Sequence, residues 1–127
     1  MRLSDRMGIE LVEVSADRVL ATMPAEGNLQ PYGLVHGGAS VVLAEMAGTA
    51  AAATWAAAAG KIALGIEVNA THHRAVRSGT VTAVATPLHR GGSLATYEIV
   101  LTDEAGRRTC TCRLTCRLSA APGAAAR

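Results

Sequence analysis

Glu45 is the side chain that fits least with its surroundings in this sequence. It is the only ionisable residue between His36 and Lys61, in a stretch made mostly of alanine and aliphatic residues. Because an unpaired carboxylate is costly to bury, three interpretations are open: a solvated helix face, a structural ion pair, or a reactive group in a cleft. Thr49 follows one helical turn later on the same face, where its hydroxyl could hold the carboxylate or a water molecule.

A histidine and two glycines, His36-Gly37-Gly38, stand where a loop gives way to this apolar stretch. Glycine leaves its backbone N–H unobstructed, and at the start of a helix that group lies at the positive end of the helix dipole. Such donors can hold a carbonyl oxygen as negative charge develops on it. The same glycines would also suit a tight turn that lets the helix pack closely, with His36 as a capping or core residue.

Spacing and composition both point to more than one subunit. His36 and Glu45 are nine residues apart, so on one helix they would be ~13 Å apart and face roughly opposite sides. If they share a site, we expect them to come from different chains. The chain has 127 residues, half of them hydrophobic, but no Phe, one Trp and two Tyr. A small core built from such thin side chains gains stability when apolar surface is buried in a homo-oligomer.

Two polar segments carry arginine beside other polar or flexible residues. One is His72-His73-Arg74 followed by Arg77, and the other is Arg90-Gly91-Gly92-Ser93. Guanidinium and backbone N–H groups of this kind can bind phosphates. Solvated loops would have the same composition, so both interpretations stay open.

The three cysteines, Cys110, Cys112 and Cys116, fall on the apolar face of one expected strand. There we interpret them as small hydrophobic side chains. No fourth ligand follows at a spacing typical of zinc, and no histidine lies close enough in the pattern to activate a thiolate. We therefore expect no metal site and no cofactor.

The elements that must position these residues are one helix and a series of strands. The Ala- and Leu-rich stretch 39–59 predicts the helix, and because it is apolar nearly all round, we expect it to be buried on most sides. Alternating patterns predict strands over 9–14, 18–23, 62–71, 79–87 and 94–102 and a last strand through 118, of which the first two form a hairpin. The Pro, Gly and Asn residues of 24–33 predict a loop. This is an α+β domain, an antiparallel sheet wrapped around one helix, over residues 1–118. We expect the tail, 119–127, to be disordered.

Charge and composition exclude several classes of protein. A net charge of +2 with few aromatic residues argues against nucleic-acid binding, which favours basic stripes interleaved with stacking side chains. Charged residues interrupt the first ten positions, so no secretory signal is expected. The longest apolar stretch, 46–60, is short of the ~20 residues that span a bilayer. We expect no membrane association and a cytoplasmic location with reduced thiols.

Two segments, Gln30–Ser40 (QPYGLVHGGAS) and Leu43–Thr49 (LAEMAGT), resemble the hotdog-fold thioesterases. The likeness is to the PaaI-like branch in particular, with the 4-hydroxybenzoyl-CoA and 1,4-dihydroxy-2-naphthoyl-CoA thioesterases. It continues through 65–70, 79–81 and 103–107 into the last strand, and so covers nearly the whole chain. The resemblance implies a central helix wrapped by a sheet, dimers or dimers of dimers, and hydrolysis of an aroyl- or acyl-CoA to free acid and CoA at the dimer interface.

The resemblance also implies roles for particular residues. Glu45 matches the family's carboxylate, which acts as nucleophile or general base, and Gly37 matches the residue whose N–H polarises the thioester carbonyl. Gln30 and His36 match groups that orient that carbonyl and help the thiolate leave. Thr49 matches a hydroxyl residue that positions water with the carboxylate.

Two further assignments concern the substrate. His72 matches a residue that lines the acyl pocket, and the loop with Arg90, Gly91 and Ser93 matches one that meets the CoA phosphates. Two alternatives remain: a hotdog dehydratase or hydratase, and a module that binds acyl-CoA without turnover. The first usually carries His followed by Phe, Pro and Gly, which His36 lacks; the second has no need of Glu45.

Overall fold

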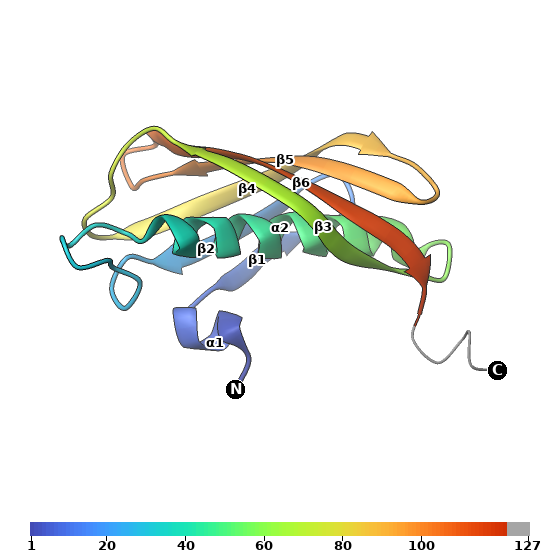
Figure 1. Cartoon of the computed structure of the whole chain (residues 1–127), viewed down its shortest axis with the longest axis horizontal. Helices are drawn as coiled ribbons and strands as arrows, with labels where there is room; N and C mark the ends of the chain where they lie inside the picture. Colours follow the sequence, from blue (N-terminus) through green and yellow to red (C-terminus); the bar gives the residue numbers. More distant parts are fainter. Residues whose placement is uncertain (122–127) are drawn as a thin grey trace.

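One long helix lies in the hollow of a curved antiparallel sheet in the computed structural model, which describes residues 1–121 (Figure 1). The helices are α1 (Leu3–Met7) and α2 (Gly37–Ala57). The strands are β1 (Glu10–Val14), β2 (Val19–Pro24), β3 (Lys61–His72), β4 (Thr80–Arg90), β5 (Leu94–Thr102) and β6 (Arg108–Ala120). The expected α+β architecture is confirmed.

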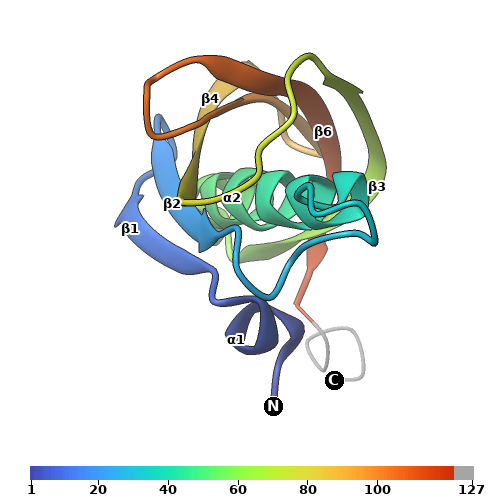
Figure 2. The ribbon, with the colours of Figure 1, turned by 90° about the vertical axis from the view of Figure 1, so that its left-hand side faces the viewer.

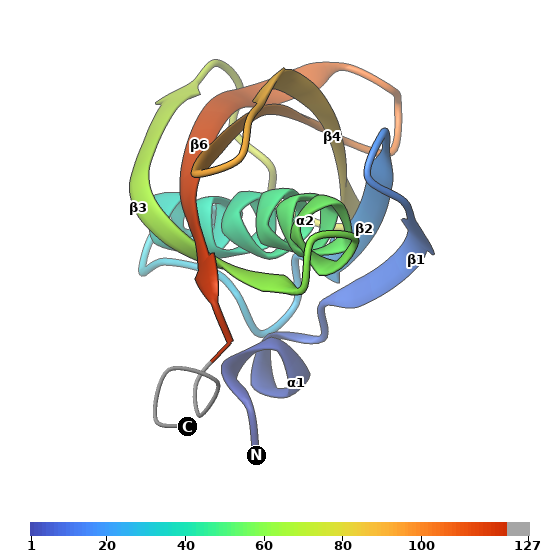
Figure 3. The ribbon, with the colours of Figure 1, turned by 90° about the vertical axis from the view of Figure 1, so that its right-hand side faces the viewer.

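The strands form one sheet in the order β1-β2-β4-β5-β6-β3, and every neighbouring pair is antiparallel. Figures 2 and 3 look at the molecule from its two ends and show how this sheet curls around α2. The helix connects β2 to β3, which lie far apart in the sheet order, so the chain crosses the hollow through α2. β1 and β3 are the two edge strands.

Small residues let α2 approach the sheet closely. A Cβ placed on Gly48 would lie 2.7 Å from Cδ2 of Leu114 and 3.1 Å from Cδ1 of Ile99, so the helix touches the strands there with no room for a side chain. The inward-facing residues of β2, β4, β5 and β6 alternate with outward-facing ones, as expected for half-buried strands. A core of thin side chains is filled by this close contact between helix and sheet.

The cysteines pack as expected. Cys110, Cys112 and Cys116 are all free and buried on the inner face of β6. The sulfur atoms of Cys110 and Cys112 are 3.5 Å apart. Their interpretation as small core side chains is confirmed.

Several expected boundaries differ from the observed ones. α2 begins at Gly37 and ends at Ala57, two residues before the expected limits at each end, because His36 caps it. α1 was not expected from the sequence. β6 continues to Ala120, so the first two residues of the expected tail belong to the sheet; residues 122–127 lie outside the described part of the chain.

The expectation that α2 is buried on most sides is wrong for a single chain. The sheet covers one side of the helix, and on the other side Ala53, Thr54 and Trp55 are exposed while Glu45 and Thr49 are half-buried. An alanine-rich helix is apolar on every face, so its sequence does not mark the side that meets the sheet.

The edge strand β3 is also open. Leu64 and Ile66 are 54% and 58% exposed there, and the outer edge of the strand has no partner among residues 1–121. Unpaired, apolar strand edges readily pair with another chain. In the same described range, no helix is both long and apolar enough to cross a membrane.

Candidate active site

The residues expected to act in chemistry lie in three groups along α2. Gln30, His36, Gly37 and His72 gather at the first turn of the helix. Glu45 and Thr49 lie near its middle. The end of β4 and the loop to β5, which carry Arg90, Gly91 and Ser93, lie at its last turn.

His36 is the N-cap residue of α2. Its Nδ1 accepts a hydrogen bond of 2.9 Å from the N–H of Gly38. A Cβ on Gly38 would come within 3.1 Å of this nitrogen, so glycine there lets the ring fold back over the helix end. A neutral imidazole that accepts at Nδ1 carries its proton on Nε2. The exposed ring therefore presents Nε2–H as a donor to whatever binds in front of the helix.

Gly37 presents a free donor beside His72. The N–H of Gly37 makes no hydrogen bond within residues 1–121, as is usual for the first N–H of a helix. Nε2 of His72, at the end of β3, lies 3.0 Å from where a Cβ of Gly37 would be. The missing side chain therefore leaves room for the imidazole and keeps the N–H accessible. The arrangement suits an oxygen that gains negative charge.

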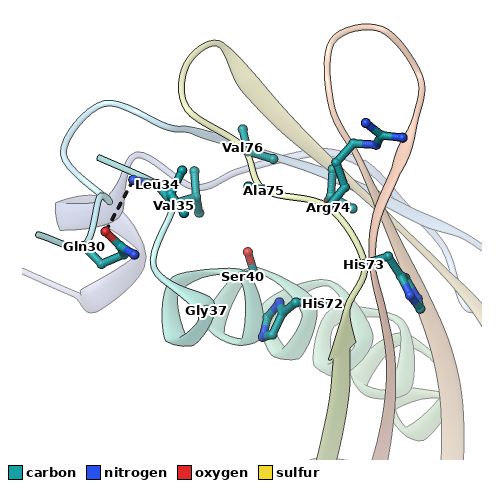
Figure 4. A pocket seen from close by; sticks show the side chains of 11 residues that line it. Gln30, Leu34, Val35, Gly37, Ser40, His72, His73, Arg74, Ala75 and Val76 are labelled. Atoms are coloured by element: carbon teal, nitrogen blue, oxygen red, sulfur yellow. Dashed lines mark hydrogen bonds between the residues drawn. The ribbon is translucent and has the colours of Figure 1, made fainter. Parts of the chain in front are cut away.

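Gln30 belongs to a loop held by many hydrogen bonds. Its Oε1 accepts from the backbone N–H of Tyr32 and, at 3.5 Å, from that of Leu34. With the oxygen engaged, the side-chain amide N–H₂ is the end left free to bind a substrate atom. Figure 4 shows Gln30 with its oxygen turned toward Leu34.

Asn28 fixes this loop to the rest of the fold. The buried side chain donates two hydrogen bonds of 2.8 Å, to the carbonyl oxygens of Met7 and Pro24. The backbone carbonyl oxygen of Asn28 accepts from the N–H of His36 at 2.8 Å. One asparagine thus connects α1, the end of β2 and the start of α2. Sequence reasoning gave Asn28 no role, and the turn-forming composition around it gave no signal for these long-range bonds.

A cavity of about 340 Å³ opens at the first turn of α2 (Figure 4). Its lining includes Gln30, Gly37 and His72 together with Ser40 and Thr109, which are buried. The structure therefore brings three of the expected site residues to one cavity. It adds Ser40, which stands in the motif His36–Ser40 but was given no role from sequence.

Glu45 occupies a different part of the molecule, against β3. Its Oε2 lies 2.7 Å from the position that a Cβ of Gly65 would take. The carboxylate is half-buried, and it makes no hydrogen bond or ion pair within the described residues. Of the three interpretations from sequence, a structural ion pair with another side chain of residues 1–121 is therefore wrong. The interpretations that remain are a solvated helix face and a reactive group in a cleft.

Thr49 and Cys116 lie close to this carboxylate. Burial raises the pKa of the Cys116 thiol, and the negative charge of Glu45 raises it further, while a hydrogen bond with the Thr49 hydroxyl lowers it. The thiol therefore stays protonated beside the carboxylate. Glu45 and Thr49 face the same region, as their spacing of one turn predicts.

The first-turn group and Glu45 are well separated within one chain. Gly37 and Glu45 are eight positions apart in the helix, which is a rise of ~12 Å. Gly37 borders His72 at one end of β3, whereas Glu45 borders Gly65 seven positions earlier in the same strand. A single substrate carbonyl can therefore meet both groups only if they come from two chains.

Arg90 lies at the far end of α2 and already has partners. Its Nη1 is 2.6 Å from Oδ1 of Asp17, and its guanidinium stacks 4.9 Å above the ring of Trp55. The carbonyl oxygen of Gly91 accepts from Nε1 of Trp55 at 3.0 Å. The backbone oxygen of Ser93 accepts from the N–H of Leu118 at 2.8 Å. These bonds fix the loop against the helix and against β6.

A second cavity, of about 460 Å³, opens beside this loop. It is lined by Trp55, Lys61, Arg90 and Gly91 over a floor that includes Ala56 and Ala59. Two cations over an apolar floor would suit a ligand that carries both phosphate and apolar parts. Within residues 1–121, no cluster of three or more His, Cys, Asp or Glu side chains is placed to hold a metal ion.

Comparison with known proteins gives one consistent family. The model of the thioesterase superfamily matches residues 32–110. A putative esterase of Deinococcus radiodurans is 44% identical over 91% of this chain and 73% of its own length. The proofreading thioesterase EntH of Cronobacter turicensis is 45% identical over 88% of this chain and 82% of its own.

Solved structures agree with this result. A thioesterase from Haemophilus influenzae superposes with a TM-score of 0.85 and 38% identity, over 92% of this chain and 82% of that one. A putative esterase from Mycobacterium tuberculosis gives a TM-score of 0.90 at 27% identity, over 93% and 96% of the two chains. The chain therefore belongs to the thioesterase superfamily and is a thioester hydrolase with the hotdog fold.

Proposed function

We propose that the protein hydrolyses an acyl- or aroyl-CoA thioester to the free acid and CoA, at a site shared by two copies of the chain. Glu45 supplies the carboxylate, as nucleophile or as general base on water. The observation that carries this proposal is the half-buried carboxylate of Glu45 with no partner of its own within residues 1–121.

A dimer would supply what one chain lacks. The exposed edge of β3, with Leu64 and Ile66, adjoins the uncovered side of α2, which is mostly alanine around Glu45 and Thr49. Pairing of two β3 edges would satisfy their free backbone groups and cover Leu64 and Ile66. It would also place Glu45 of one copy near the Gly37 region of the other. Assembly as a dimer or a dimer of dimers is thus part of this proposal.

The first turn of α2 would bind the thioester carbonyl. The N–H of Gly37, at the positive end of the helix, stabilises the oxyanion as the tetrahedral state forms. The free amide of Gln30 orients the same carbonyl. His36 donates from Nε2 and helps the thiolate depart, which is undemanding because a thiolate is a good leaving group. Glu45 and Thr49 act on the opposite side, where water or the carboxylate itself attacks. These steps call for no metal or redox cofactor.

The two cavities fit the two parts of the substrate. The acyl group would lie by His72 and Ser40, in the cavity at the first turn of α2. The CoA phosphates would lie by Arg90, Gly91 and Ser93, where Lys61 adds a second cation. Arg90 pairs with Asp17, and the Lys61 ammonium donates to the carbonyl oxygen of Gly92 at 2.6 Å, so both cations would bind phosphate with their remaining N–H groups.

A thiol-release assay tests the proposal directly. Benzoyl-, 4-hydroxybenzoyl-, phenylacetyl- and short aliphatic acyl-CoAs are offered to the wild type and to Glu45→Ala, with mass measured by light scattering. Hydrolysis that is lost in a folded, dimeric Glu45→Ala supports the proposal. Hydrolysis that survives in that variant contradicts the role of Glu45. Binding of acyl-CoA without release by the wild type would favour the binding module, and hydration of an enoyl-CoA would favour the hydratase.

A single-turnover experiment in H₂¹⁸O separates the two roles of Glu45. As a nucleophile, Glu45 forms an anhydride, and hydrolysis at its own carboxyl carbon leaves ¹⁸O in the enzyme, whereas attack at the substrate carbon labels the acid. If Glu45 acts as a general base, water attacks the substrate carbon directly, so ¹⁸O appears only in the acid in the first turnover. Label in the Glu45 peptide would establish the covalent route.

A further inference from the structure

Gly65 stands at an irregularity of β3, directly beneath Glu45. The strand pairs with β6 in regular antiparallel register until Gly65, which lies opposite Cys116. The register then shifts, so that Glu67 pairs with Thr115 and Ile66 is the extra residue of a β-bulge. Bulges are frequent beside active sites, where they change the direction of nearby side chains.

The backbone at Gly65 does not require glycine. Its φ is not positive, unlike that of Gly8, Gly27 and four other glycines in the described chain. An L-residue could adopt this conformation without backbone strain. The reason for glycine at this position must therefore lie in the space around it.

That space is occupied by the carboxylate of Glu45. A Cβ on Gly65 would lie 2.7 Å from Oε2 and 3.8 Å from Cδ of Glu45. The nearest atom that does not belong to Glu45 is Cδ1 of Leu114, at an ordinary contact distance of 3.5 Å. A methyl group at position 65 would thus displace the end of one flexible side chain and little else.

The neighbouring strand β6 also indicates that Gly65 leaves space for the Glu45 carboxylate. Cys116 pairs with Gly65 in the sheet. Besides burial, which raises it most, the pKa of its thiol is affected by a hydrogen bond with the Thr49 hydroxyl, which lowers it, and by the charge of Glu45, which raises it. The carboxylate, the hydroxyl and the bare backbone of Gly65 therefore meet at one place between α2, β3 and β6.

We infer that Gly65 is a positioning residue for the thioesterase reaction: its missing side chain gives the Glu45 carboxylate its place against β3. The inference rests on the proposed role of Glu45 in hydrolysis. Displacement of a reacting group by about 1 Å can lower a rate on the order of 100-fold. We therefore expect Gly65→Ala to act on turnover while leaving the fold and substrate binding nearly intact.

The experiment compares Gly65→Ala, Glu45→Asp and the double variant with the wild type, using the best CoA ester from the thiol-release assay. We expect Gly65→Ala to lower kcat at least about 10-fold with KM changed less than about threefold. Glu45→Asp shortens the side chain by one methylene, so it relieves the conflict with a methyl at position 65. It should therefore cost less in the Gly65→Ala background than in the wild type, a non-additive result.

Thermal melting and light scattering accompany the kinetics, and Gly48→Ala is the matched control. That variant places the same methyl group against packed core atoms instead of the carboxylate, so we expect it to lower the melting temperature and not kcat at a given folded fraction. A folded, dimeric Gly65→Ala with wild-type kcat overturns the inference. So does strict additivity with Glu45→Asp, or a rate loss that only follows loss of melting temperature or of the dimer. Hydrolysis by Glu45→Ala instead refutes the proposed role of Glu45, whatever Gly65 does.

Discussion

The first turn of α2 and its middle hold their polar groups in different ways. At the first turn, Nδ1 of His36, Oε1 of Gln30 and the amide of Asn28 all have hydrogen-bond partners within the chain. In the middle, the Glu45 carboxylate has none among the described residues and rests against the bare backbone of Gly65. Hydrogen bonds hold the polar groups in one half of the candidate site. In the other half, the carboxylate is positioned by the space that Gly65 leaves for it.

The difference follows from what each half would do. Donors that stabilise a developing charge work best when they are fixed before the reaction, since they then cost no reorganisation. A carboxylate that attacks, or that removes a proton, must keep its oxygens free for substrate or water. Hydrogen bonds from the protein would stabilise its charge and make it a weaker base.

The largest expected effect on activity comes from removing the Glu45 charge in the middle of α2. Glu45→Gln keeps the size of the side chain but removes the charge, so kcat should fall by about 10²–10⁴-fold, the usual range for a lost acid–base group. Because the carboxylate has no partner to leave unsatisfied, the free energy of unfolding should change by less than about 0.5 kcal/mol. Steady-state kinetics and urea denaturation check the two parts. A large loss of stability would mean that Glu45 has a structural partner after all.

Removing the hydrogen bonds that hold the loop before α2 should instead lower the free energy of unfolding. Asn28→Ala leaves the carbonyl oxygens of Met7 and Pro24 without their buried donor, at about 1–3 kcal/mol each. The loop with Gln30 loosens as a result, so KM and kcat should both worsen. Urea denaturation with the same assay measures both. Asn28→Asp is the control of similar size that accepts but cannot donate, and it should be no more stable than Asn28→Ala.

The packing of the helix middle sharpens the contrast. Gly48→Ala forces a methyl group against Leu114 and Ile99, and overpacking of this kind costs about 1–3 kcal/mol. Chemical denaturation should show that loss. If Gly48→Ala were as stable as wild type, the core between α2 and the sheet would be looser than the contacts indicate, and Gly65 would lose its matched control.

Among the variants that should lose stability, the smallest loss is expected at the N-cap of α2. His36→Ala removes the acceptor for the Gly38 N–H and should destabilise the protein by about 1 kcal/mol, whereas His36→Asn keeps a capping acceptor and should recover most of it. Both variants lack the imidazole, so both should lose activity. Recovery of activity together with stability in His36→Asn would show that His36 serves only as a cap.

Much of the fold was predictable because its signals are local. The alternation of Thr109–Leu118 predicts a strand with cysteines inward, and β6 has them there. The expected strand 94–102 matches β5 at both ends. The side of α2 that faces the sheet was not predictable, because alanine lines the helix on every side and gives no contrast in hydrophobicity.

The candidate site divides in the same manner. Gly37 and Glu45 could be singled out from sequence, since an isolated carboxylate and a His-Gly-Gly helix start are visible in the order of residues, whereas Gln30 was identified only through the resemblance to the hotdog thioesterases. Asn28, Ser40 and Gly65 could not. Each has an unremarkable type for its surroundings, and each gains its role from contacts with residues elsewhere in the fold.

The sequence by itself therefore determined the kind of fold, the helix that carries Glu45 and the loop that starts it, because helix and strand periodicity and turn-forming residues act over a few positions. Only the tertiary structure decided that Glu45 rests on Gly65, twenty positions along the chain, and that β3 and one side of α2 stay uncovered. Such contacts depend on strand register and on a bulge at Gly65, which arise from packing across the whole sheet.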